Sequence, residues 1–148
     1  MGNFRDDLKR GEEGELIVRT YLESLGGIYH SDNKNNTHDL IMSFKEKLIS
    51  YEIKTDYYVN KDRDSNNIFV EFECRGKASG IDVSKAKWFA TYFFNLGEIW
   101  FIEVDKLKAL IEEYTFKTTT LSGDNDSNTK GYLIPRFLFV EHFLVKYL

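Results

Sequence analysis

The chain has 148 residues, a net charge of −4, 42% apolar residues and 16% aromatic residues. This length can bury a core in one domain, and the composition excludes a disordered chain. The apolar runs are too short to cross a bilayer, and the first residues lack the apolar stretch of a secretory signal. Cys74, the single cysteine, fits a reducing cytoplasm. We therefore expect one cytoplasmic domain, 1–148, with no membrane partner.

The acidic balance also bears on nucleic-acid binding. A dedicated phosphate binder is usually basic, so a net charge of −4 argues against a simple DNA-binding module. A metal-dependent nuclease is an exception, because a bound cation neutralises the acidic residues of its site. The net charge therefore leaves that class of enzyme open.

The first predicted element is a helix over 4–25, in which apolar residues recur at three- and four-residue spacing. Gly11 and Gly14 interrupt this helix, which makes sense if another backbone approaches that face closely. The next elements are a short strand over 27–31, a polar loop over 32–37, a hairpin over 38–55 and a strand over 68–74 with alternating apolar residues.

A second helix is predicted to begin at Asp82 or Ser84, because four aromatic residues that follow have helical spacing. These residues are Trp88, Phe89, Tyr92 and Phe93. The later elements are a strand over 98–104, a helix after Asp105, a polar loop or exposed hairpin arm over 115–130, an edge strand over 131–134 and a terminal helix opened by Pro135. This order predicts a mixed α/β layer structure.

The hairpin over 38–55 carries the residues that are best suited to bind a metal or to catalyse a reaction. Asp39 begins its first strand, while Glu52 and Lys54 end its second strand, so regular pairing brings the three together. Because strand side chains alternate between faces, Glu52 and Lys54 share one face and Ile53 points to the opposite layer. Two carboxylates and an ammonium group at one end of a sheet predict a divalent-metal site with a cationic helper.

Phosphodiester hydrolysis needs an activated water and a stabilised oxyanion, and Mg²⁺ supplies both. Asp39 and Glu52 offer the carboxylates that Mg²⁺ prefers, and the backbone carbonyl of Ile53 lies between the side chains that face the site. Mn²⁺ is expected to substitute. Lys54 would hold the attacking water or stabilise charge on the phosphate. The ordinary alternative is a solvated Glu–Lys pair, but the upstream aspartate and the apolar strand favour the site.

The pattern of Asp39 followed by Glu52-Ile53-Lys54, after a helix with Gly11-Glu12-Glu13-Gly14-Glu15, resembles the PD-(D/E)XK nuclease superfamily. It is most similar to the small Holliday-junction-resolvase-like and phage-associated members. The resemblance implies metal ligation by Asp39 and Glu52 and a catalytic role for Lys54. It also implies that Glu15 reaches the metal directly or through water. His38 stands where the family has proline, which leaves the ligands intact.

The resemblance spans about two-thirds of the chain. It implies a restriction-endonuclease-like α/β fold with an αβββαβ core over about 4–104 and a mixed central sheet flanked by helices. A C-terminal extension over about 105–148 would add a strand and a helix. If the chain is phage-encoded, its location would be the host cytoplasm.

Two acids outside the hairpin, Glu71 and Glu73, share a face of the strand predicted to lie next to it. One of them could complete the metal shell, with Glu71 preferred for proximity. Alternatively, one faces solvent and the other pairs with Arg75 or Lys77.

Basic residues gather between 75 and 87, where a loop leads into the predicted second helix, and a helix N-terminus is a natural phosphate seat. The resemblance implies a cation on this helix that faces the site, and Lys85 is the matching residue. A solvated basic turn is the alternative for the others. The candidate DNA contacts are Arg75, Lys77, Ser79 and Lys85.

The sequence thus predicts a Mg²⁺-dependent DNA endonuclease. The predicted activity includes structure-selective cleavage of branched DNA, such as a Holliday junction. Because a junction presents two scissile strands, a homodimer is the assembly that would suit this substrate. The alternatives are a catalytically inactive nucleic-acid- or protein-binding module on the same fold, and a structural or regulatory protein with a chance motif.

Overall fold

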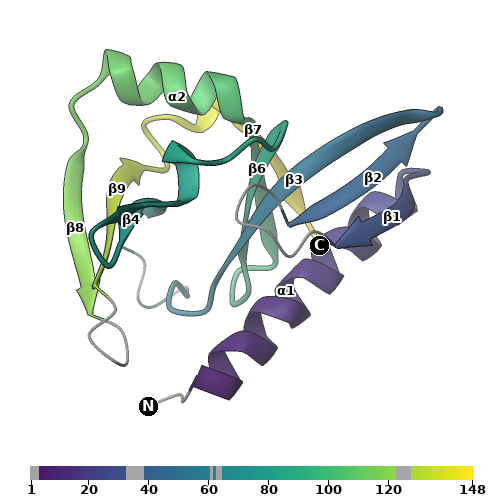
Figure 1. The fold of residues 1–148 in the computed structure, drawn as a ribbon, viewed down its shortest axis with the longest axis horizontal. Coiled ribbons are helices and arrows are strands. Elements are labelled where there is room, and N and C mark those ends of the chain that lie inside the picture. Colours follow the sequence, from purple (N-terminus) through teal and green to yellow (C-terminus); the bar gives the residue numbers. More distant parts are fainter. Residues whose placement is uncertain (1–3, 33–38, 61, 63–64, 123–127) are drawn as a thin grey trace.

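The structure is a computed structural model that describes residues 4–32, 39–60, 62, 65–122 and 128–148 (Figure 1). His38, the residue at the family's proline position, lies outside this part of the chain. The helical elements are α1 (Phe4–Ser24), η1 (Gly80–Asp82), α2 (Val104–Glu113) and η3 (Val140–His142). The strands are β1 (Ile28–Asp32), β2 (Leu40–Phe44), β3 (Lys47–Asp56), β4 (Asn67–Cys74), β5 (Lys77–Ala78), β6 (Trp88–Phe93), β7 (Glu98–Glu103), β8 (Lys117–Ser122), β9 (Asn128–Pro135) and β10 (Leu144–Tyr147).

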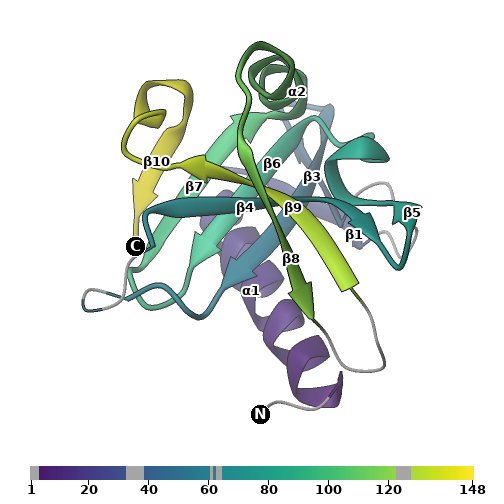
Figure 2. The ribbon, with the colours of Figure 1, turned by 90° about the vertical axis from the view of Figure 1, so that its left-hand side faces the viewer.

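The strands form two sheets. The larger has the order β1-β2-β3-β6-β7-β10, in which β3 and β6 run parallel and the other neighbours run antiparallel. The smaller is antiparallel, with the order β5-β4-β9-β8. Helix α1 lies on one face of the larger sheet and the smaller sheet crosses the other face (Figures 1 and 2). The fold is therefore mixed α/β, as the sequence predicted.

Each face of the larger sheet has its own apolar core. Val18 and Leu22 of α1 pack with Tyr51 and Ile53 of β3 in one core. The second core, between the two sheets, contains Ile68, Val70, Phe89, Phe93 and Ile134. Since Ile53 faces α1, the alternation along β3 turns Glu52 and Lys54 toward the smaller sheet. The prediction that Glu52 and Lys54 share one face of the strand and that Ile53 points to the opposite layer is confirmed.

The predicted second helix is wrong. Residues 88–93 form strand β6, which pairs with β3 on one side and β7 on the other. Helical spacing of the four aromatic residues was misleading, because a strand that is buried on both faces is apolar at every position. Their prediction as core residues is confirmed for Phe89, Tyr92 and Phe93, which are buried.

This correction changes the expected core. In the part of the chain that the structure describes, β3 and β6 are connected by β4, β5 and η1, not by an α-helix. The observed order is therefore not the expected αβββαβ. The strand that carries Glu71 and Glu73 was also placed wrongly: β4 belongs to the smaller sheet, and the neighbour of β3 on that side is β6.

The C-terminal extension also differs from the prediction. The segment 115–130 contributes strand β8 to a hairpin with β9, which confirms the hairpin alternative. Strand β9 lies inside the smaller sheet, between β4 and β8, and is not an edge strand. Pro135 ends β9 and is followed by η3 and β10 where a terminal helix was expected. Among the described residues, no helix is long and apolar enough to cross a membrane.

Gly14 allows α1 to approach β3 closely. A Cβ atom at Gly14 would overlap Oγ1 of Thr55, whereas a Cβ at Gly11 would meet no described atom. Gly14→Ala should therefore destabilise the protein by about 1–3 kcal/mol, while Gly11→Ala should stabilise it by up to about 1 kcal/mol. Urea unfolding of both variants measures these changes, and equal effects of the two substitutions would contradict the packing argument.

Candidate functional site

Asp39 is fixed against β3 at the point where β2 begins. Its backbone N–H donates to the carbonyl of Tyr51 at 2.8 Å. Its Oδ2 accepts a hydrogen bond from the backbone N–H of Ile53, also at 2.8 Å. The N–H and C=O of one strand residue point to the same side of the strand, so the Ile53 carbonyl faces the Asp39 side as well. The hairpin therefore brings the predicted carboxylate and carbonyl ligands together.

Glu52 is a buried carboxylate, with only 6% of its surface exposed. Ser84 hydrogen-bonds to it, and the Ser84 hydroxyl also accepts from the backbone N–H of Ala86 at 3.3 Å. The other carboxylate oxygen, Oε2, is buried and has no hydrogen-bond partner among the described residues. An unsatisfied buried carboxylate oxygen is costly, so its presence calls for an explanation.

The surroundings of Glu52 raise the pKa of its carboxyl group. Burial raises the pKa of Glu52 above its ordinary value of 4.5, and the nearby charges of Asp39 and Glu71 raise it further. The Lys54 charge and the Ser84 hydrogen bond act in the opposite direction but do not cancel the burial effect. These interactions show that three carboxylates and one ammonium group share this region.

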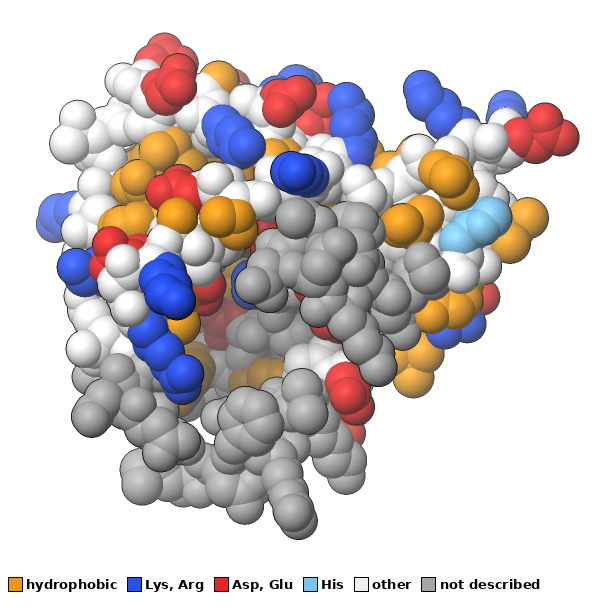
Figure 3. Space-filling model, in the orientation of Figure 1, with side chains coloured by type: hydrophobic (Ala, Val, Ile, Leu, Met, Phe, Trp, Pro, Cys, Tyr) orange, Lys and Arg blue, Asp and Glu red, His pale blue; other side chains and the backbone are white. Residues whose placement is uncertain are grey.

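A cavity of about 390 Å³ lies beside Asp39 and Lys54, and Glu52 is not among the residues that line it. Asp39, Ile53 and Lys54 line it from the hairpin, and Glu15 lines it from α1. The structure thus brings Glu15 to the same cavity as Asp39, Ile53 and Lys54, and its contact with a metal stays a prediction. In the space-filling view the face is hollowed near its centre, with acidic side chains in the hollow (Figure 3).

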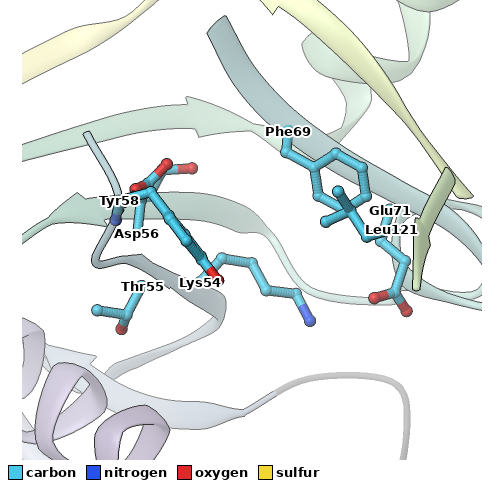
Figure 4. Close-up of a pocket in the computed structure, with 8 residues that line it drawn as sticks. Lys54, Thr55, Asp56, Tyr58, Phe69, Glu71 and Leu121 are labelled. Atoms are coloured by element: carbon cyan, nitrogen blue, oxygen red, sulfur yellow. Dashed lines mark hydrogen bonds between the residues drawn. The ribbon is translucent and has the colours of Figure 1, made fainter. Parts of the chain in front are cut away.

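A second cavity, of about 210 Å³, lies on the other side of Lys54. Its lining includes Glu71 of β4 and Thr91 of β6. The Lys54 side chain extends across this cavity toward the Glu71 carboxylate (Figure 4), and Lys54 makes no salt bridge with a described residue. Glu71 is therefore near the hairpin residues although its strand belongs to the other sheet.

The donor set fits a hard divalent cation. Among the described residues, no group of three or more His, Cys, Asp and Glu side chains could hold a metal alone. Mg²⁺ does not need one, because it commonly takes one or two carboxylates and keeps several waters. Asp39 and Glu52 supply two carboxylates, the Ile53 carbonyl adds an oxygen, and the free Oε2 of Glu52 is a ready ligand.

The predicted DNA contacts are dispersed. Arg75 and Lys77 are exposed at the turn between β4 and β5, and Ser79 precedes η1, which has only three residues. No α-helix begins there, so the predicted phosphate seat at a helix N-terminus is wrong. Glu73 pairs with Lys130 at 3.2 Å, not with Arg75 or Lys77.

Lys85 is exposed in the irregular segment before β6, not on a helix. It lines a surface cavity of about 370 Å³ together with Lys87 and Lys108. Lys87 pairs with Glu103 at 3.1 Å, and the Lys108 ammonium lies 3.5 Å from the Ser84 carbonyl. Ser84 also hydrogen-bonds to Glu52. Ser84 therefore connects this group of lysines to the buried Glu52 carboxylate.

Two site residues were missed from the sequence. Ser84 was considered only as a helix cap, and Thr91 fell within the predicted second helix. Thr91 pairs with Lys54 across the parallel β3–β6 ladder, so the two side chains share a face. Recognising 88–93 as a buried parallel strand would have placed Thr91 near the site.

Comparison with protein-family models, curated proteins and solved structures gave no match.

Proposed function

We propose that the protein is a Mg²⁺-dependent nuclease that hydrolyses phosphodiester bonds in DNA. The observation that supports this most is the carboxylate of Glu52, which is buried near Asp39 and Lys54 with Oε2 unsatisfied among the described residues. A buried carboxyl group whose pKa is raised, close to a second carboxylate and an ammonium group, is typical of a functional site. Membership of the PD-(D/E)XK superfamily, a cytoplasmic location and action on branched DNA as a homodimer belong to the same proposal.

Asp39 and Glu52 would hold the cation, with the Ile53 carbonyl as a third oxygen and Glu15 reaching it directly or through water. Bound Mg²⁺ supplies Lewis-acid polarisation of the phosphate and lowers the pKa of water. The protein prepares its carboxylates in advance: the Ile53 N–H orients Asp39, and the Ser84 hydroxyl orients Glu52. Such orientation of ligands by neighbouring donors strengthens a metal site.

Lys54 acts on the phosphate. Lys54 lines both cavities, and its ammonium group is not neutralised by a salt bridge to a described carboxylate. A cation held in this way stabilises the negative charge that develops on the phosphate oxygens during attack by water. The same ammonium can hold the attacking water by a hydrogen bond.

A cleavage assay tests this function. The purified protein is incubated with labelled Holliday junctions, nicked duplex, linear duplex and single-stranded DNA, with Mg²⁺, Mn²⁺ or EDTA. We expect either metal to support cleavage of at least one DNA, and EDTA to stop it. Absence of cleavage with every DNA would contradict the proposal and favour an inactive module on this fold.

Lys85 offers a separate prediction about DNA binding. Lys85→Ala should weaken binding equally for all sequences, because a phosphate contact carries no sequence information. Each lost phosphate contact should lower the slope of log K against log salt by about 0.9. Lys45→Ala, at the exposed tip of the β2–β3 hairpin, is the control. Binding titrations at several salt concentrations measure the slope, and a wild-type slope in the Lys85 variant would contradict this role.

A further inference from the structure

The second cavity has a lining suited to a flat, mainly apolar group. Tyr58 lies on one side of it, and Phe69 and Leu121 lie on the other (Figure 4). Aromatic walls of this kind stack on nucleobases, and every base has a face on which to stack. The cavity, at about 210 Å³, opens between the larger and the smaller sheet.

Several residues that line this cavity also carry polar groups. Thr91 is 4% exposed, and its Oγ1 has no hydrogen-bond partner among the described residues although it lines the cavity. Glu71 directs its carboxylate to the same space. Asp56 is used locally, because its Oδ1 accepts the backbone N–H groups of Tyr58 and Val59 at 2.8 and 2.9 Å. Glu71 and Thr91 are therefore available to recognise a ligand, beside the ammonium group of Lys54 and the hydroxyl group of Thr55.

These groups select the kind of ligand. Two carboxylates line the cavity against one ammonium, so a phosphate group is disfavoured there. An ionised carboxylate only accepts hydrogen bonds, so Glu71 fits a neutral group that presents N–H donors. Among the bases, cytosine, adenine and guanine carry an amino group (N4, N6 and N2) that can donate to Glu71, whereas thymine has no amino group.

We propose that this cavity receives an unpaired base with an amino group (cytosine, adenine or guanine) from the DNA strand that is cut at Asp39, Glu52 and Lys54. The inference rests on the proposed nuclease function. Lys54, Thr55 and Tyr58 line both cavities, so the base and the scissile phosphate would occupy adjoining positions on one strand. A base can enter such a pocket only after leaving the helical stack, which costs least at branches, mismatches and single strands.

The test compares single-stranded oligonucleotides of equal length that consist of dC, dA or dT. We expect the wild-type protein to cut dC and dA at least about tenfold more efficiently than dT. Glu71→Gln should remove most of this preference, because an amide both donates and accepts. Glu73→Gln is the matched control, since Glu73 lies on the same strand but pairs with Lys130.

Tyr58 provides a second variant that should leave the fold intact, because its side chain is 78% exposed. Tyr58→Ala should raise KM for dC by about tenfold through loss of stacking, and Tyr58→Phe should keep the wild-type value. Equal cleavage of dC, dA and dT, or a preference unchanged in the Glu71 variant, would overturn the inference and leave the nuclease function standing.

Binding separates the two proposals. Fluorescence anisotropy measures the affinity of Glu52→Gln, which should not cut DNA, for the same oligonucleotides. Tighter binding of dC and dA than of dT supports the base pocket even if the wild-type protein cuts no DNA, in which case only the nuclease function fails. Equal binding of the three oligonucleotides contradicts the base pocket.

Discussion

Glu52→Gln should abolish Mg²⁺-dependent cleavage, with a loss of about 10³-fold or more, comparable with removal of the strongest electrostatic groups in enzyme sites. The reason is that glutamine keeps the shape of the side chain but loses the charge that would bind the cation. Single-turnover cleavage of the best DNA from the substrate panel measures the loss. Glu73→Gln is the control and should cut at the wild-type rate, because the Glu73 side chain is partly exposed in a salt bridge with Lys130.

The same substitution should stabilise the fold at neutral pH. Burial raises the pKa of Glu52, so the folded protein holds this proton more tightly than the unfolded chain does. Stability from this group is therefore fully present below the ordinary value of 4.5 and is lost as the pH rises through the raised value. The increase in unfolding free energy caused by Glu52→Gln should appear as the pH rises from 4.5 through the raised pKa of Glu52, and it should persist to neutral pH. Urea unfolding without metal measures the difference, and a variant less stable than wild type at neutral pH would contradict it.

Lys54→Met should lower the cleavage rate by about 10²- to 10³-fold without weakening Mg²⁺ binding. Methionine keeps an unbranched side chain of similar length but removes the charge that stabilises the phosphate oxygens. Mg²⁺ affinity should stay the same or rise, because a positive charge near Glu52 and Asp39 is gone. Lys45→Met, at the exposed tip of the β2–β3 hairpin, is the control.

Two measurements separate these effects of Lys54. Single-turnover kinetics at saturating Mg²⁺ reports the chemical step, and calorimetric titration with Mn²⁺ reports the affinity for metal. A wild-type rate in Lys54→Met would remove this residue from the mechanism. A loss of metal affinity with a normal rate at saturation would assign Lys54 to the assembly of the metal site.

The parts of the site that could be predicted from the sequence are those formed by local structure. Asp39, Glu52 and Lys54 belong to one hairpin, whose pairing follows from alternating side chains and a short turn. The register observed for β2 and β3 carries Asp39 to the Ile53 amide. Glu15 was added only because the family resemblance implies an acid on the first helix, whereas Gly14 indicated that this part of α1 approaches the sheet closely.

The parts that could not be predicted depend on contacts distant in the sequence. Strand β6 is apolar on both faces, so its local pattern does not distinguish it from a buried helix, and its partner β3 lies more than thirty positions away. Because of that error, Thr91 was not recognised as a site residue and Lys85 was wrongly predicted to lie on a helix. Glu71 shows the same limit: β4 joins the smaller sheet, and only the packing of that sheet on the larger one brings Glu71 near Glu52.

Cleavage started by Mg²⁺ in metal-free protein tests the proposed nuclease site most directly. Wild-type protein, Glu52→Gln and Glu73→Gln are mixed with labelled branched and single-stranded DNA in EDTA, and Mg²⁺ is then added in excess. We predict no cleavage before the addition, rapid cleavage afterwards by the wild-type and Glu73→Gln proteins, and none by Glu52→Gln. Cleavage by Glu52→Gln at the wild-type rate, or no cleavage by any of the three proteins, would contradict a metal-dependent nuclease site at Asp39, Glu52 and Lys54.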